Sequence, residues 1–213
     1  MLPAKPPRLI LPGLYRFPPN RDTLGGTAYF CLHPQGNLLI DAPPQSPETE
    51  RLLLDQGGVR YLVLTQRDGA GPALGAWQKR FNLEIIVQEQ EAYLLPQLRR
   101  VTFADQLTLA PELTLLWTPG YSPGALCLYD RRQGGILFTG RHLAPDAQGN
   151  PQPFRGAKTF HWRRQLKSVA QLQAYFAKES LAYLCPGAYT GFLRGRDYIS
   201  PALPALQAIA TAG

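Results

Sequence analysis

Short runs of hydrophobic positions, partly alternating with polar ones, mark the first half of the chain and are typical of strands. Residues 27–33 and 38–43 form two such runs on either side of a Pro-Gln-Gly-Asn turn, and they predict a β-hairpin. Residues 46–58 predict a helix, because Ser46 is a suitable N-cap, Pro47 suits the first helical position and two glycines end the segment.

Strands and helices then alternate along the chain. Residues 61–64 and 84–87 are short apolar runs typical of strands, and a helical segment at 73–81 lies between them. Because strands that alternate with helices assemble into layered sheets, this order predicts a mixed α/β sheet.

Strands follow strands in the middle of the chain, and helices return towards its end. The pattern predicts strands at 107–119, 125–130 and 135–140, a helix at 161–180, a strand at 181–185 and a helix over 201–212. Residues 144–157 are the least regular internal segment, and we interpret them as a lid or a long connection.

Length and composition predict one globular domain over residues 1–213, with 45% hydrophobic and 17% charged residues. The first 20 residues contain six prolines and predict an extended arm that is ordered by packing alone. No apolar run reaches the roughly 18 residues that span a bilayer, and prolines interrupt the opening segment where a signal peptide needs an apolar stretch. We therefore expect a cytoplasmic protein. Its three cysteines are far apart and predict reduced, buried thiols: Cys31, Cys127 and Cys185.

Basic residues exceed acidic ones by 22 to 15, which permits an acidic partner without identifying one. Much of the excess is arginine, and three Arg-Arg pairs stand out: Arg99-Arg100, Arg131-Arg132 and Arg163-Arg164. Nucleic-acid binding requires such residues to gather on one face, whereas scattered pairs are solvated surface. The sequence favours the second interpretation and leaves nucleic-acid binding as an alternative.

Several segments taken together resemble a known family. In chain order they are LLID, LTQRDGAG, WTPGYSPGALCLYD, ILFTG and CPGAYTG. They resemble the metallo-β-lactamase fold, and within it the glyoxalase II-like hydrolases, over nearly the entire chain. The resemblance implies an α/β fold of four layers, an αβ/βα sandwich in which two mixed sheets face each other between outer helices. It also implies an active site at one edge of the sandwich.

The same resemblance locates the metal ligands of the family, and almost all of them are absent here. The loop that supplies two spaced histidines and an Asp-His pair begins at Thr65, and the later ligands belong to a turn, a strand end and a Pro-Gly loop. The corresponding residues are Gln66, Asp68, Ala70, Gly71, Tyr121, Arg141 and Ala188. Zinc needs three or four imidazole, thiolate or carboxylate donors. An arginine about 4 Å from a dication would be repelled by roughly 8 kcal/mol at an effective dielectric near 20. We expect no metal, no other cofactor and no catalytic residue.

The residues at this edge are candidates for a vestigial or ligand-binding site: Gln66, Arg67, Asp68, Tyr121, Arg141 and His142. We expect Asp68 to form a salt bridge with Arg67 or Arg141, and Tyr121 to fill the space left by the metal with its hydroxyl hydrogen-bonded. If the cleft stays open instead, Arg141 would bind a phosphate, sulfate or carboxylate. His142 is interpreted as an orienting or packing residue, and the remaining histidines, His33 and His161, as structural or surface residues.

Three functions remain from the sequence. The first is a metal-free, catalytically inactive protein that binds a protein partner or a small anionic ligand. The second is a glyoxalase II-type metallo-hydrolase with a degenerate site. The third is a nucleic-acid-binding protein, which the net charge of +7 permits.

Overall fold

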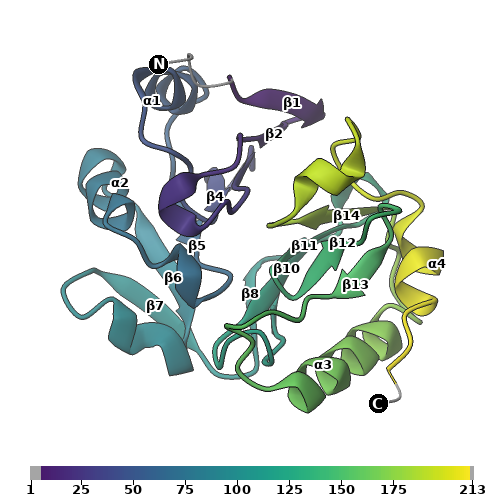
Figure 1. Cartoon of the computed structure of the whole chain (residues 1–213). Coiled ribbons are helices and arrows are strands. Elements are labelled where there is room, and N and C mark those ends of the chain that lie inside the picture. The colour runs from purple at the N-terminus through teal and green to yellow at the C-terminus, as the bar shows by residue number, and fades with distance from the viewer. Residues whose placement is uncertain (1–5, 212–213) are drawn as a thin grey trace.

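The computed structural model describes residues 6–211. Residues 1–5 of the predicted arm, residue 212 of the predicted last helix and residue 213 lie outside it. Two β-sheets face each other, and helices cover both outer faces (Figure 1). Helices α1 (Pro47–Asp55) and α2 (Ala73–Phe81) pack on the first sheet. Helices α3 (Trp162–Tyr175) and α4 (Ala202–Gln207) pack on the second. The predicted αβ/βα sandwich is confirmed.

The first sheet has seven strands in chain order, β1 to β7. Pairing is antiparallel from β1 to β4 and parallel from β4 to β7. The connections of these parallel pairs contain α1, α2 and a 3-10 helix at Glu89–Leu94, because parallel neighbours need a crossover connection. The strands are β1 (Arg8–Leu11), β2 (Leu14–Arg16), β3 (Tyr29–Cys31), β4 (Leu38–Ile40), β5 (Tyr61–Val63), β6 (Glu84–Gln88) and β7 (Arg100–Phe103).

The second sheet has the order β14-β11-β10-β9-β8, and a separate hairpin pairs β12 with β13. Strand β14 joins this sheet parallel to β11 after the chain has passed through α3. The strands are β8 (Gln106–Ala110), β9 (Leu113–Trp117), β10 (Leu126–Asp130), β11 (Ile136–Gly140), β12 (Leu143–Pro145), β13 (Pro151–Pro153) and β14 (Tyr183–Pro186). Short 3-10 helices are η1 (Arg21–Thr23), η2 (Arg67–Gly69), η3 (Glu89–Leu94), η4 (Arg132–Gly134) and η5 (Thr190–Leu193).

Alternation along the strands divides the hydrophobic residues into three layers of core. On β4, Leu38 and Ile40 face the opposite sheet, whereas Leu39 faces α1 and α2. On β10, Leu126 faces the opposite sheet and Cys127 faces α3 and α4. The central strands β3 to β6 and β9 to β11 are therefore buried on both faces, which explains why they are almost continuously apolar.

Three sequence predictions need correction. The proline-rich arm is not held by packing alone, because its described part forms β1 and β2 and pairs with β3. Residues 144–157 are not irregular throughout, because Ala144–Pro145 and Pro151–Pro153 pair in the β12–β13 hairpin. The strand β7 was missed, because three of its four residues are exposed or half-buried and carry no hydrophobic alternation.

Other expectations hold. All three cysteines are free and buried. The side chain of His161 caps the N-terminus of α3 by accepting a hydrogen bond from the Arg164 amide, and His33 is buried beside Glu112. Within residues 6–211, no helix combines the length and the apolar character needed to cross a membrane.

Candidate functional site

The loop after β5 is fixed by a buried carboxylate at the end of the neighbouring strand. Asp41 follows β4 and accepts two hydrogen bonds from Thr65, one from its amide at 2.9 Å and one from its hydroxyl at 2.6 Å. Burial raises the pKa of Asp41 to about 6, although both bonds from Thr65 lower it. The carboxylate thus serves to hold the start of the loop.

Directly after Thr65 the chain makes the single turn η2. The Gln66 side chain accepts a hydrogen bond from the Asp68 amide at 2.7 Å, as an N-cap does. Gln66 is buried, and its amide side chain is occupied in shaping the backbone. The turn directs the Asp68 carboxylate inward, where only 6% of the side chain is exposed.

Tyr121 approaches Asp68 from the turn between β9 and β10. Its hydroxyl donates a short hydrogen bond to Asp68 Oδ2, and its ring packs against Phe154 with the centroids 5.6 Å apart. The residue is 2% exposed. Burial, followed by the bond to Asp68, raises the pKa of Tyr121 far above its usual range, so the phenol remains protonated.

Arg141 follows β11 and completes the group. Its Nη2 donates to the backbone carbonyls of Thr23 at 3.0 Å and Leu24 at 2.7 Å. Its Nε lies 3.8 Å from Asp68 Oδ2, and the guanidinium lies 5.9 Å from the Tyr121 ring centroid. With 5% of its side chain exposed, Arg141 joins η1, the Asp68 loop and the Tyr121 turn. We call Asp68, Tyr121 and Arg141 the clasp.

The last segment at this edge is the loop after β14. The Gly187 amide donates to the Gly140 carbonyl at 2.7 Å, and a Cβ on Gly187 would lie 2.7 Å from the Gly140 Cα. Only glycine permits this approach. Ala188 is 1% exposed. The predicted convergence of the four loop segments at one edge of the sandwich is therefore what the fold produces.

The sequence left Arg67 and Arg141 as alternative salt-bridge partners of Asp68, and the structure distinguishes between them. The ion pairs are with Arg141 and with Lys158, whose Nζ lies 3.4 Å from Asp68 Oδ1. Arg67 takes no part, because its guanidinium donates to the Lys158 carbonyl. His142 is buried, both its ring nitrogens lack a hydrogen-bond partner, and burial lowers its pKa to about 3. Its imidazole is therefore neutral and makes no polar contact within the described chain.

The open cleft considered for anion binding is not formed. Arg141 is buried against Asp68 and two carbonyls, and Tyr121 occupies the adjoining space. An anion could reach the guanidinium only by displacing these groups. Lys158 and Phe154 were missed by sequence reasoning, because Lys158 is 90 residues from Asp68 and no local pattern marks either residue.

No family model matches this sequence, and no curated protein matches it either. Solved structures do match its fold. A metallo-β-lactamase from Erythrobacter litoralis has a TM-score of 0.68 at 14% identity, covering 94% of this chain and 93% of that chain. One from Pseudomonas aeruginosa, in its mono-zinc form, has a TM-score of 0.64 at 16% identity, covering 96% of each.

This chain has the metallo-β-lactamase fold. An N-acyl homoserine lactone hydrolase, solved with its product at a catalytic metal centre, is also similar. That comparison has a TM-score of 0.62 at 18% identity and covers 87% of this chain and 98% of that chain. The finer resemblance to glyoxalase II-like hydrolases stays a prediction.

The residues at this edge of the metallo-β-lactamase fold do not suit a metal ion. Within the described part of the chain, no three His, Cys, Asp or Glu side chains form a group that could hold one. Asp68 is a carboxylate donor, but its oxygens face Tyr121, Arg141 and Lys158. Asp41 is occupied by Thr65. A dication would face the fixed charge of Arg141 with too few ligands to offset the repulsion.

The clasp offers little chemistry of its own. A general base must reach a proton of the substrate, but the Asp68 carboxylate is buried and already accepts from Tyr121. The Tyr121 phenol holds its proton, and Arg141 is a fixed cation committed to backbone carbonyls. What the arrangement does is join η1, the η2 loop and the β9–β10 turn to one another.

Proposed function

We propose that this protein is a metal-free, non-hydrolytic member of the metallo-β-lactamase fold that acts by binding a partner. One observation is central to this proposal. The clasp of Asp68, Tyr121 and Arg141 occupies the edge where the resemblance to this fold locates the metal ligands of the family, and its members are buried and contact one another. Such a group stabilises loops, and it provides neither a water activated by metal nor a free base.

The fold itself favours a binding role. Four loop segments that would carry catalytic groups are instead tied to one another, which gives a pre-organised surface on a rigid support. Pre-organisation lowers the entropic cost of association, since the loops need not be ordered when a partner arrives.

Metal content tests the proposal most directly. Protein purified without added metal or chelator is measured by elemental analysis, beside the variant Asp68→Ala and the matched control Asp55→Ala, whose carboxylate is exposed on α1. We expect far less than one zinc, iron or manganese per chain in all three. About one metal per chain that disappears in Asp68→Ala alone would overturn the proposal in favour of a degenerate metallo-hydrolase.

Hydrolysis is the second readout. Lactones, thioesters, β-lactams and phosphodiesters are incubated with the protein in the presence and absence of added zinc. We expect rates at the level of buffer with the same zinc concentration. A rate that depends on protein and zinc, and that falls in Asp68→Ala but not in Asp55→Ala, would contradict the proposal.

A further inference from the structure

Residues 147–178 contain no aspartate or glutamate, although the chain has 15 acidic residues in all. The same stretch contains six lysines and arginines: Arg155, Lys158, Arg163, Arg164, Lys167 and Lys178. It runs from the β12–β13 turn through α3. Much of the net charge of +7 is therefore placed on one continuous segment.

The three arginine pairs of the sequence have different surroundings. Arg131 pairs with Glu179 at 2.9 Å, and Arg132 pairs with the buried Asp130 at 2.6 Å. Arg99 donates to the backbone carbonyls of Asn82 and Leu83. Arg100 donates to those of Leu95 and Leu98.

Arg163 and Arg164 differ from these pairs. Within the described residues neither has the acidic partner that Arg131 and Arg132 have, and neither side chain donates a hydrogen bond as those of Arg99 and Arg100 do. An uncompensated arginine pair on a helix surface attracts anions.

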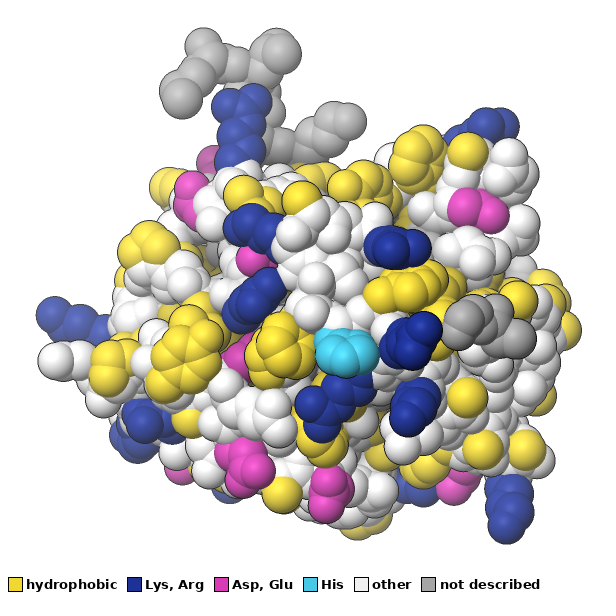
Figure 2. Space-filling model, turned by 60° about the horizontal axis from the view of Figure 1, so that its bottom comes forward, with side chains coloured by type: hydrophobic (Ala, Val, Ile, Leu, Met, Phe, Trp, Pro, Cys, Tyr) yellow, Lys and Arg dark blue, Asp and Glu magenta, His cyan; other side chains and the backbone are white. Residues whose placement is uncertain are grey.

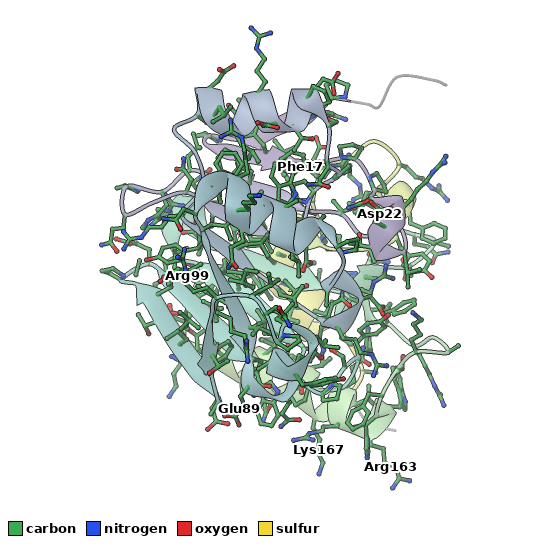
Figure 3. All side chains as sticks on the ribbon, turned by 90° about the vertical axis from the view of Figure 1, so that its left-hand side faces the viewer. Phe17, Asp22, Glu89, Arg99, Arg163 and Lys167 are labelled. Carbon is green, nitrogen blue, oxygen red and sulfur yellow. The ribbon has the colours of Figure 1, made fainter. Side chains whose placement is uncertain are left out.

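Three of the cations of this segment are gathered on one face. Arg163, Arg164 and Lys167 line one hollow of about 410 Å³ together with His161. Figure 2 shows Lys and Arg side chains grouped around an exposed histidine on this side of the molecule. In Figure 3, Arg163 and Lys167 both point away from the ribbon at the lower edge. We call Arg163, Arg164, Lys167 and the neighbouring Phe160 the α3 face.

Aromatic rings are interleaved with these cations. Phe160 is 50% exposed, two residues before α3 begins. The Arg164 guanidinium lies 4.9 Å from the Trp117 ring centroid, and that of Arg155 lies 5.1 Å from the Trp162 centroid. Trp117 and Trp162 are half-buried, so Phe160 is the ring of this group that is open to a base. Proteins bind single strands by pairing cations with phosphates and stacking bases on accessible rings.

A second hollow, of about 350 Å³, adjoins the first across Arg164 and Lys167. Trp117 lines it, and so does Asp105, the one acidic residue among the described residues that line either hollow. Asp105 repels phosphate, so the backbone of a bound strand would follow the Arg163 side. Volumes of this size accommodate a group as large as a nucleobase.

We propose that the α3 face binds single-stranded nucleic acid, with Arg163, Arg164 and Lys167 contacting phosphates and Phe160 stacking on a base. A single small anion fits less well, because Arg163 and Lys167 are one helical turn apart and point outward rather than converge. An acidic protein would pair with the cations but would leave the exposed Phe160 ring without a defined partner. The inference rests on the proposed function, since it names the partner of a non-hydrolytic module.

Fluorescence anisotropy of the whole protein with a labelled oligouridine or oligothymidine of about 16 nucleotides tests this, with a chelator present. Competitors are the corresponding duplex, polyglutamate and inorganic phosphate. We expect the single strand to bind in preference to all three. Affinity should fall with salt, because phosphate contacts release counterions.

Charge and stacking are tested separately by variants. Arg163→Gln/Lys167→Gln removes two phosphate contacts, and we expect the slope of log affinity against log salt to become shallower by about 1.4. Phe160→Ala should weaken binding by about 5- to 150-fold with little change in that slope. The matched control is Arg51→Gln/Lys79→Gln, which removes the same charge from exposed positions on α1 and α2 and should bind like the wild type.

Four results would overturn the inference. They are no binding at low salt, equal losses in the control and test variants, duplex or polyglutamate binding as tightly as the single strand, and an unchanged affinity in Phe160→Ala. Failure of the proposed function looks different. In that case the strand, or another substrate, would be cut when zinc replaces the chelator, whatever the α3 face contributes to binding.

Discussion

The hydroxyl of Tyr121 donates a hydrogen bond to the carboxylate of Asp68, 53 residues earlier in the chain. This contact joins the β9–β10 turn to the loop after β5, and Arg141 adds the positive charge that the buried carboxylate requires. Because a buried carboxylate without partners costs several kcal/mol, the three side chains depend on one another. Substitutions at Tyr121 and Arg141 measure that dependence.

Tyr121→Phe keeps the ring and removes the donor. We expect a loss of about 1–3 kcal/mol in the free energy of unfolding, because Asp68 then lacks one of its hydrogen bonds in a buried place. Chemical denaturation measures the loss. Tyr93→Phe is the control, since Tyr93 is 67% exposed, and should stay within about 0.5 kcal/mol of the wild type. Equal stability of both variants would mean that the Tyr121 hydroxyl contributes nothing.

Arg141→Met leaves Asp68 without its buried cation and two backbone carbonyls without their donor. We expect destabilisation of about 3–5 kcal/mol. The double variant Asp68→Leu/Arg141→Met should lose less than the sum of the two single variants, because it leaves no unpaired charge. Urea unfolding of the four proteins gives the coupling energy. Additive losses would show that the two residues do not act as a pair.

His142 gives stability a pH dependence of defined sign. Burial lowers its folded pKa to about 3 from 6.5, so below pH 6.5 the unfolded chain binds a proton that the folded protein does not. Its contribution is present above that pH and is lost as the pH falls, by about 1.4 kcal/mol per unit. His142→Leu should therefore lose less stability than the wild type between about pH 6 and pH 4.

Comparison of the wild type with His142→Leu separates His142 from another buried titratable group. Asp41 acts in the opposite sense, since its pKa is raised to about 6 and its contribution is lost as the pH rises, but it is the same in both proteins. Parallel stability curves for the wild type and His142→Leu would show that His142 does not titrate on unfolding.

Two glycines of one loop should respond differently to alanine. A Cβ on Gly187 would lie 2.7 Å from the Gly140 Cα and 2.9 Å from its carbonyl oxygen, whereas one on Gly191 would meet nothing within 4 Å. We expect Gly187→Ala to cost about 1–3 kcal/mol, because backbone must move, and Gly191→Ala to stay within about 0.5 kcal/mol. Calorimetric melting compares them. Similar melting temperatures would mean that the loop after β14 does not pack closely against Gly140 at the end of β11.

Local sequence determined most of the regular elements. The helix α1 begins where Ser46 caps it and Pro47 follows, because both preferences act within a few residues. The strands β4, β5 and β6 are likewise marked locally, by short apolar runs in the sequence. Strands β1, β2 and β7 were not predicted from the sequence, because they carry little hydrophobic alternation. They form by pairing with the neighbouring strands of the first sheet.

The sequence by itself also determined that the metal donors are missing, since the identity of a side chain is sufficient to show whether it can bind zinc. It predicted where Asp68, Tyr121 and Arg141 would meet. Only the tertiary structure decided that the cleft is closed and that Lys158, not Arg67, is the second cation near Asp68. It likewise decided that Arg163 and Arg164 lack acidic partners whereas Arg131 and Arg132 have them. The reason is physical: charge pairing depends on distances between residues as much as 90 positions apart, which no local pattern encodes.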